Sequence, residues 1–324
     1  MAAGCLTATM AAGMMAQGAR GTTNQALIQA NAALLAGEAD KALALLQDVP
    51  QQRSEAAEAR NLECRVRLTL EEWDAAASAC EQAVRLEGQN SWYHLWLGRA
   101  LGERAGRASF LSAYSLAKRV RDEFETAVRL DPRNAEALAD LGEFYRQAPG
   151  IVGGGTAKAL DVAAQMDKVD PARALELRSR IAEESKDYGT AERDLKQAIP
   201  VAAHPAFQWM GLASFYQQRK RWSEMEAAIH SCVSAAERDK HASVALYDGA
   251  SVLTNANRDP ALAAKMLQDY LASPSKTDEA PAFVAHLRLA KLKDELGDPN
   301  GANRERSLAQ GMAREYRPKS DARH

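Results

Sequence analysis

The segment from Gly150 to Lys158 has the residue types of an anion-binding loop. Glycines that open onto a helix can present backbone N–H groups to a phosphate. A phosphate loop needs Gly-Lys-Ser/Thr directly after a β-strand, whereas here Gly155-Thr156-Ala157-Lys158 follows a helical pattern that ends near Gln147. We therefore expect a turn in which the glycines adopt positive φ and Pro149 ends the preceding helix. An enzymatic or small-ligand site at residues 150–155 is the less favoured alternative.

Other patterns of catalytic or metal-binding residues are missing from the sequence. The six histidines are scattered with no His-x-x-x-His pair, so zinc ligation is unsupported. No Gly-x-Ser-x-Gly motif occurs, and the carboxylates fall mostly on the polar faces of amphipathic helices. We predict that the protein is not an enzyme and uses no metal or cofactor.

Two of the four cysteines bear on the cellular compartment. Cys64 and Cys80 fall in the first and second helices of one predicted hairpin, where they could face each other. If the protein is exported they could form a disulfide, and otherwise they are two small buried side chains. Cys232 stands where alanine is usual, so we expect it to serve in packing.

The chain repeats itself at intervals of 34 residues. The clearest pair of repeats matches Tyr188, Ala191, Leu195 and Ala198 with Trp222, Met225, Ile229 and Cys232. A period of this length, built from helix-forming residues, predicts stacked helix-turn-helix units.

The repeated unit resembles the tetratricopeptide repeat. That motif has a large residue early in the first helix, then Leu-Gly or Leu-Ala, an aromatic residue, and small residues where the two helices cross. One unit matches at Trp209, Leu212, Ala213, Tyr216, Trp222, Met225, Ile229 and Cys232, and another at Leu141, Gly142, Tyr145, Ala159, Ala163 and Pro171. The resemblance covers Ala26 to Tyr316 and implies an all-α, right-handed superhelical solenoid of about eight antiparallel helix pairs.

The register divides the chain into units with boundaries good to a few residues. The expected units are 23–56, 57–90, 91–134, 135–171, 172–205, 206–239, 244–281 and 282–315. Together they make one solenoid over residues 20–316, whose terminal units turn one face to water. A charged, disordered tail is expected over 317–324.

One unit carries ten additional residues between Gly98 and Ala127. Apolar residues at three- and four-residue steps predict one unbroken helix from near Ser109 to Leu130. Its first turns should project beyond the neighbouring units. The large residues there either pack back on Trp92 and Trp96, which is the favoured interpretation, or form an exposed contact site; they are Phe110, Leu111 and Tyr114.

Composition and charge exclude some partners and leave others open. With 41 basic and 43 acidic residues the net charge is -2, which gives no general attraction to nucleic acid. We predict no membrane span. Residues 1–19 are uncharged and resemble the apolar part of a secretory signal peptide, with a cleavage site near Ala16 or Gly18, although the preceding basic segment is absent; the alternative is a disordered N-terminus. An exported or periplasmic location is therefore favoured over a cytoplasmic one.

The concave face of such a solenoid is lined by the first helix of each pair and is the expected binding surface. Carried over from the repeat pattern, the lining residues of four consecutive units are Trp92, Leu95, Arg99, Glu103, Glu136, Glu143, Arg146, Arg173, Glu176, Arg180, Glu183, Phe207, Met210 and Gln217. Arginine can hold carboxylates in bidentate fashion, and the large apolar residues can anchor a partner. Alternatively, the charged residues from Arg173 to Glu183 pair along their own helix.

These observations favour a non-catalytic scaffold or adaptor that binds a peptide or protein partner along its concave face. The alternative is a structural subunit of a larger envelope assembly. The identity of the partner and the oligomeric state are not encoded in any pattern that we recognise.

Overall fold

The computed structural model describes residues 25–47, 49 and 53–317, and within them every regular element is a helix. A helix over residues 25–35 and α2 (Ala39–Gln47) form the first antiparallel pair. The other seven pairs are α3 (Arg53–Thr69) with α4 (Trp73–Leu86), α5 (Ser91–Ala105) with α6 (Phe110–Leu130), α7 (Ala135–Gln147) with α8 (Thr156–Met166), α9 (Pro171–Glu184) with α10 (Tyr188–Val201), α11 (Pro205–Gln218) with α12 (Trp222–Arg238), α13 (Val244–Asn255) with α14 (Pro260–Ala272), and α15 (Ala282–Glu295) with α16 (Pro299–Met312). The predicted all-α solenoid of helix pairs is confirmed.

Local sequence signals start these helices at the expected residues. The side chains of Asn134 and Asp170 accept hydrogen bonds from backbone N–H groups in the first turns of α7 and α9. Proline occupies the first turn of α9, α11, α14 and α16, where its missing N–H costs nothing. Small residues stand where the helices of a pair cross. An added Cβ on Gly98 of α5 would lie 2.4 Å from the ring of Phe124 on α6.

The long helix α6 runs over Phe110–Leu130, as predicted. The favoured interpretation of its first turns is wrong, because Phe110 and Leu111 are 79% and 81% exposed instead of packed on Trp92 and Trp96. The extension lifts these side chains beyond the neighbouring pairs. The result is an exposed apolar patch of Phe110, Leu111 and Tyr114, which we call the α6 patch.

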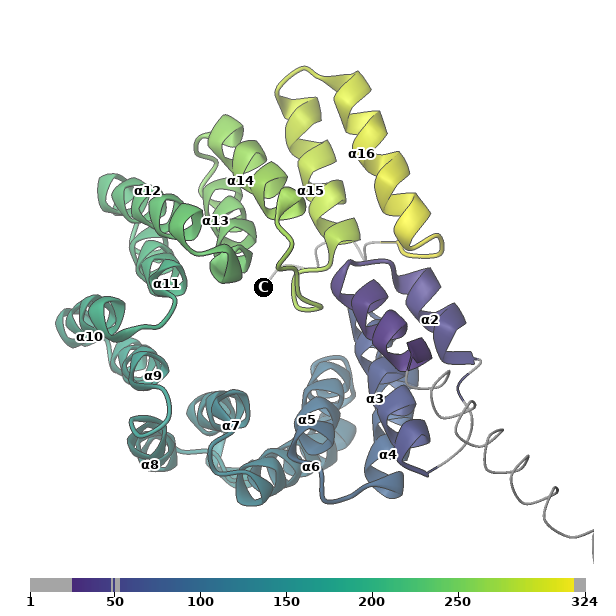
Figure 1. Ribbon diagram of the computed structural model, residues 1–324. Helices are drawn as coiled ribbons and strands as arrows, with labels where there is room; N and C mark the ends of the chain where they lie inside the picture. The colour runs from purple at the N-terminus through teal and green to yellow at the C-terminus, as the bar shows by residue number, and fades with distance from the viewer. Residues whose placement is uncertain (1–24, 48, 50–52, 318–324) are drawn as a thin grey trace, which may run out of the picture.

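The two ends of the solenoid meet, so the helix pairs form a ring around a central opening (Figure 1). Apolar residues of the first two pairs share one buried cluster with Phe283, Ala309 and Ala313 of the last pair. Polar contacts reinforce this seam, since the Asp40 carboxylate accepts from the Arg314 backbone N–H at 2.8 Å. The expectation that the terminal units face water is therefore wrong where they cover each other.

The connection from α14 to α15, residues 273–281, turns into the ring and contacts its inner wall (Figure 1). Asp278 forms an ion pair of 2.8 Å with Arg65 of α3, and Glu279 forms one of 3.1 Å with Arg99 of α5. We call this segment the inner loop. It joins the second half of the ring to the first across the opening.

Cys64 of α3 and Cys80 of α4 are joined by a disulfide, with their Cα atoms 5.2 Å apart and both side chains fully buried. Cys232 is buried and free. Because disulfides persist in oxidising compartments, the bond agrees with export, which stays a prediction. The signal-like segment 1–19 and nearly all of the tail over 317–324 lie outside the described residues. Among those that are described, no helix combines the length and apolarity needed to span a bilayer.

Candidate functional site

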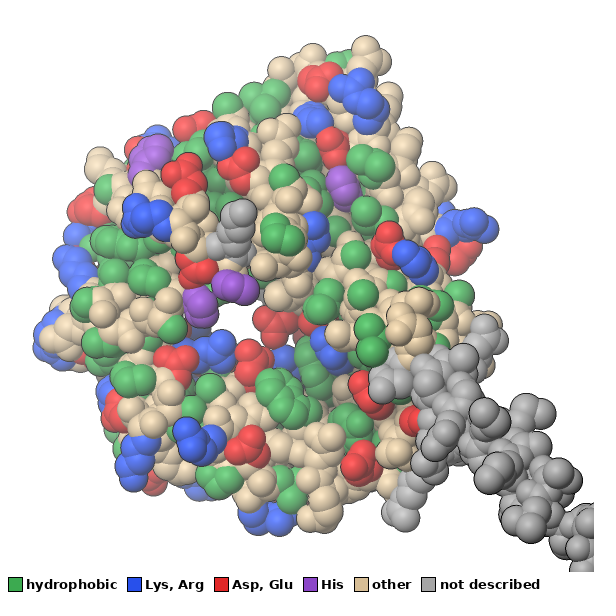
Figure 2. Space-filling model, viewed as in Figure 1, with side chains coloured by type: hydrophobic (Ala, Val, Ile, Leu, Met, Phe, Trp, Pro, Cys, Tyr) green, Lys and Arg blue, Asp and Glu red, His purple; other side chains and the backbone are tan. Residues whose placement is uncertain are grey.

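The first helices of successive pairs form the inner wall of the ring, and this wall is hollowed by cavities. One cavity of about 690 Å³ lies over α7, α9 and α11, and another of about 420 Å³ reaches from α7 and α9 to α13 and the inner loop. Four residues line both cavities, namely Glu176, Arg180, Phe207 and Asp248. The two cavities therefore adjoin, and we call them together the inner groove. Figure 2 shows the central opening bordered by charged side chains of both signs.

A third cavity, of about 480 Å³, lies at the seam between the two ends of the chain. Aromatic residues from distant segments line it, including Trp96, Tyr247 and Tyr316. The guanidinium groups of Arg65 and Arg99 both lie over the Trp96 ring, at 5.0 and 4.6 Å from its centroid. Such cation–π contacts hold both arginines in place beside the inner loop.

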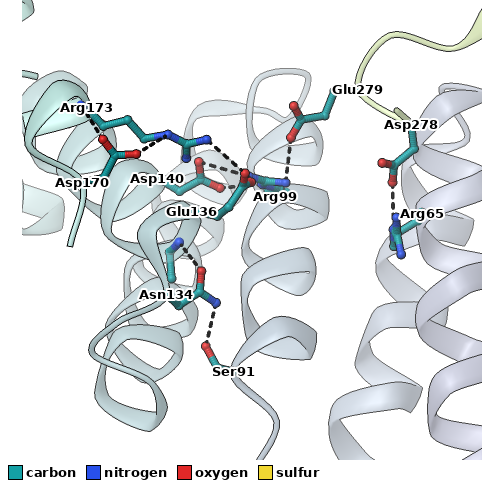
Figure 3. A network of polar contacts seen from close by, with 11 residues as sticks. Arg65, Ser91, Arg99, Asn134, Glu136, Asp140, Asp170, Arg173, Asp278 and Glu279 are labelled. Atoms are coloured by element: carbon teal, nitrogen blue, oxygen red, sulfur yellow. Dashed lines mark hydrogen bonds and ion pairs between the residues drawn. The ribbon is translucent and has the colours of Figure 1, made fainter. Parts of the chain in front are cut away.

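Arg99 is the centre of an ion-pair network that fixes the inner loop (Figure 3). Its guanidinium contacts Glu136 and Asp140 of α7, each at 2.6 Å, in addition to Glu279. Burial opposes the charge on Arg99, but these carboxylates outweigh it and raise the pKa of the guanidinium. Burial likewise opposes the charge on Glu136, yet Arg99 and Arg173 lower its pKa. Arg99 and Glu136 therefore serve first to hold the ring together.

The structure places ten of the predicted partner-binding residues on the lining of these three cavities. They are Arg99, Glu103, Glu136, Glu143, Arg146, Arg173, Glu176, Arg180, Glu183 and Phe207. Two further predictions are wrong: Leu95 is 0% and Met210 4% exposed, so both belong to the core and cannot reach a partner. Trp92 is 47% exposed, but neither it nor Gln217 lines these cavities.

Arg173, Glu176, Arg180 and Glu183 form no ion pairs with one another, so that alternative is wrong, although Arg173 does pair with Asp170 at the start of α9, at 3.4 Å. Arg180 contacts Glu143 of α7 at 3.5 Å, Glu183 accepts from Arg219 directly after α11 at 2.8 Å, and Arg173 contacts Glu136 of α7 at 3.4 Å. These bonds tie α9 to its neighbours on both sides. They also leave Arg180 54% exposed in the inner groove, where it can contact a partner.

Two carboxylates of the inner groove have no ion pair within the described part of the chain. Glu176 accepts one hydrogen bond from Gln208 at 3.0 Å, and Asp248 makes none. Burial raises the pKa of Glu176, although Arg180 and other neighbours oppose the rise. The Asp248 side chain is exposed to solvent in the inner groove, although the protein atoms around it raise its pKa to about 6 against the pull of Arg288.

The arrangement of the helix pairs identifies the fold. Antiparallel helix pairs follow one another along the described chain, with an interval of 34 residues from the start of α9 at Pro171 to the start of α11 at Pro205, and small residues stand where the helices cross, as in tetratricopeptide repeats. The chain is a tetratricopeptide-like solenoid.

Comparisons with known proteins give resemblances of low identity to three solved structures. No family model matches the sequence, and no curated protein matches it significantly. A thermophilic tetratricopeptide repeat protein of Thermus thermophilus is 23% identical, over 61% of this chain and 100% of its own, with a TM-score of 0.44. A tetratricopeptide repeat protein of Parabacteroides merdae is 17% identical over 80% and 94% of the two chains (TM-score 0.38), and MamA is 15% identical over 53% and 93% (TM-score 0.35).

The glycine-rich turn of this tetratricopeptide-like solenoid has no free amide pocket at its centre. The backbone N–H groups of Val152, Gly153, Gly154 and Gly155 all donate to backbone carbonyls of the same turn or of α7. Gly153 and Gly155 have φ of 97° and 149°, as the predicted turn requires, and α7 ends at Gln147. Lys158 donates to the carbonyl of Gly153 at 2.8 Å. An anion at the centre of the turn would have to displace these bonds, which disfavours the small-ligand alternative there.

Sequence reasoning missed the residues that α13 and the inner loop contribute. Asp248, Thr277 and Glu279 line the inner groove together with Gln208 of α11. Extending the repeat register by one more unit would have placed Val244 on the inner wall, close to Asp248. No local pattern identifies the inner loop, because its place depends on closure of the ring. Among the described residues, no group of three or more His, Cys, Asp or Glu side chains is arranged to hold a metal ion.

Proposed function

We propose that this protein is a non-catalytic scaffold that binds a polypeptide partner in its inner groove. The observation that carries the proposal is that two adjoining cavities extend along α7, α9, α11 and α13. A long open groove suits an extended segment, whereas chemistry usually needs an enclosed, water-excluding pocket. A segment on the inside of a ring can also contact several helices at once.

The groove offers a partner both polar and apolar contacts. Arg180 is exposed and can present its planar guanidinium to a carboxylate in bidentate fashion. Phe207 lines both cavities and can contact an apolar side chain. Some charged residues of the groove already pair with each other, such as Glu183 with Arg219. These residues would contribute more to the position of the bound partner than to its affinity.

Replacing Arg180 or Phe207 with alanine is expected to weaken partner capture at least about tenfold, because anchors at the centre of an interface carry most of its binding energy. Helicity should change little, although Phe207→Ala should lower the unfolding temperature somewhat because part of the ring packs against the core. The measurement is affinity capture from the native source, with identification of the bound proteins, beside circular dichroism of each variant. Matched controls on the outer helices are Arg85→Ala and Leu160→Ala. Equal loss of capture and helicity would make Arg180 and Phe207 structural residues.

A second candidate is a structural subunit of a larger assembly, and the α6 patch favours it. Exposed apolar residues that lie side by side often mark a protein interface. If this surface is permanently covered in the native assembly, the protein purified alone should self-associate. Phe110→Ser with Leu111→Ser should then restore a monomer, as measured by light scattering during gel filtration. A wild-type protein that is monomeric at high concentration would argue against this candidate.

A further inference from the structure

We propose that the inner loop is an autoinhibitory strap, which occupies a site on the inner wall for an acidic segment of the partner. The inference rests on the proposed function and deepens it, because it concerns access to the wall that the partner contacts. The site consists of Arg65 of α3 and Arg99 of α5, and the loop occupies it with Asp278 and Glu279 (Figure 3). The chain therefore contains its own competitor for these two arginines.

The strap lies between the inner groove and the cavity at the seam. Glu279 lines both the cavity of about 420 Å³ in the inner groove and the cavity of about 480 Å³ at the seam. Thr277 lines only the first of these two cavities, and Asp278 only the second. An extended partner in the inner groove therefore meets the loop before it reaches α5 and α3. Displacement of the loop tip would open one cavity to the other.

Backbone anchors hold the two ends of the loop, whereas side chains alone make the polar contacts of its tip with the opposite wall. The Ser243 hydroxyl donates to the carbonyl of Ser275, and the Tyr270 hydroxyl donates to that of Ala280. Both donors belong to the second half of the ring. In the part of the chain that the structure describes, the two carboxylates of the tip make the only hydrogen bonds and ion pairs between the loop and the first half. These are the polar contacts that the tip must exchange to leave the wall.

The contact between Glu279 and Arg99 is the more easily exchanged of the two. Arg99 contacts Glu136 and Asp140 at 2.6 Å each, and Glu279 at 3.1 Å. Three carboxylates around one guanidinium repel one another, and Glu279 is the most exposed of them, at 57%. An exposed ion pair stabilises little, so a carboxylate of the partner can take the place of Glu279.

Arg65 gives the site its preference for an anion. Its one ion pair within the described residues is with Asp278 at 2.8 Å, and these two side chains are 18% and 8% exposed. A largely buried cation that loses its anion is costly, so the strap leaves most readily when another carboxylate replaces Asp278. Trp96 contacts both guanidinium groups independently of the loop, which keeps them in place for that replacement. Two neighbouring acidic side chains, as in the Asp-Glu of the loop, suit this pair of arginines.

A peptide with the sequence of the loop can test the site in solution. A tethered segment has an effective concentration of about 1 mM, so a loop that stays docked must bind its site with a Kd of about 1 mM or below. The probe is the capped peptide Ser-Pro-Ser-Lys-Thr-Asp-Glu-Ala-Pro, which is residues 273–281. Calorimetry would titrate it, at up to about 10 mM, into the full-length wild type and the double variant Asp278→Ala with Glu279→Ala. We expect saturable binding to the variant and at least about tenfold weaker binding to the wild type, whose site is occupied.

Controls isolate the acidic side chains and their arginine. The same peptide with Asn and Gln in place of its Asp and Glu should not bind the double variant. Adding Arg65→Gln to that variant should weaken binding of the acidic peptide at least about tenfold, with an unchanged circular dichroism spectrum. Asp161→Ala with Glu295→Ala is the matched control, because both carboxylates are exposed and form no ion pair with a described residue. This control should bind the peptide no better than the wild type does.

Trypsin reports on the strap without any peptide. Lys276 lies beside the tip, and its ammonium group donates to the carbonyl of Ser273 at 2.5 Å. Release of the tip in the double variant should make cleavage after Lys276 at least about tenfold faster, because the rate follows the population of the open form. Mass spectrometry of the folded protein during digestion measures this rate. High salt should accelerate the same cleavage in the wild type, since it weakens the ion pairs of the tip.

Four results would each overturn the strap. They are equal binding of the acidic peptide to the wild type and the double variant, no binding to the variant, equal binding of the neutral peptide, and unchanged cleavage after Lys276. The proposed function is judged separately, by the Arg180 and Phe207 variants. It survives failure of the strap if those variants still lose their partner, and it fails by itself if they keep it.

Discussion

Gly37→Ala is expected to open the seam of the ring. Gly37 lies in the turn before α2 with φ of 78°, and an added Cβ would lie 2.6 Å from the backbone nitrogen of Ala282 in α15. The left-handed conformation costs a non-glycine residue about 1–2 kcal/mol. Overpacking at the seam adds about 1–3 kcal/mol or separates the two ends. Small-angle scattering should report a larger radius of gyration, and urea should unfold the variant at a lower midpoint.

Gly297→Ala is the matched control for this experiment. Gly297 has φ of 80° in the turn between α15 and α16, with no other atom within 4 Å of the position of its Cβ. The Gly297→Ala variant therefore has only the conformational cost of a left-handed alanine, about 1–2 kcal/mol. The difference between the two variants isolates the contact at the seam. If both lose the same stability and keep the wild-type radius of gyration, the ends of the chain do not depend on each other.

Removing the Cys64–Cys80 disulfide is the other change with a large expected effect. The bond closes a loop with a sequence separation of 16 residues, for which the entropy of the unfolded chain predicts a loss of about 3 kcal/mol. The double substitution Cys64→Ala with Cys80→Ala should therefore lower the unfolding temperature by several degrees. Reductant should lower it for the wild type but not for the double variant.

Cys232→Ala serves as the control, because Cys232 is buried but free, so its loss changes packing without removing a bond. The oxidation state itself is checked by thiol labelling of the unfolded protein and mass spectrometry. Labelling of both Cys64 and Cys80 in protein from its native compartment would contradict the bond. It would also remove the support that the bond gives to export.

Local residue patterns were sufficient to predict the helix pairs. Spacing of 34 residues, small residues at helix crossings, and caps such as Asn134 and Asp170 act over one or two turns, so they can be read without knowing the fold. The same holds for the length of α6 and for the turn after Gln147. The sequence also predicted which face of each first helix lines the ring, and ten of the proposed contact residues do line the inner cavities.

Errors in the candidate site have physical causes. Leu95 and Met210 stand at positions that the repeat pattern assigns to the inner wall, but neighbouring helices cover them completely or nearly so. Phe110 and Leu111 are large and apolar, which favours burial on average, yet the extension of α6 carries them beyond anything that could cover them. The packing of one helix pair against the next determines whether these side chains are buried or exposed. The sequence of a single helix does not contain that information.

The sequence by itself determined the repeating helix pairs, their boundaries and the general face for binding, because these depend on contacts between residues close together in the chain. Only the tertiary structure decided that the ends meet, that the inner loop reaches Arg99 across the ring, and that Asp248 and Gln208 share one cavity. Ring closure depends on small rotations summed over all the pairs, and no local pattern records that sum. Which charged side chains of the inner groove lack an ion pair also depends on closure of the ring, for the same reason.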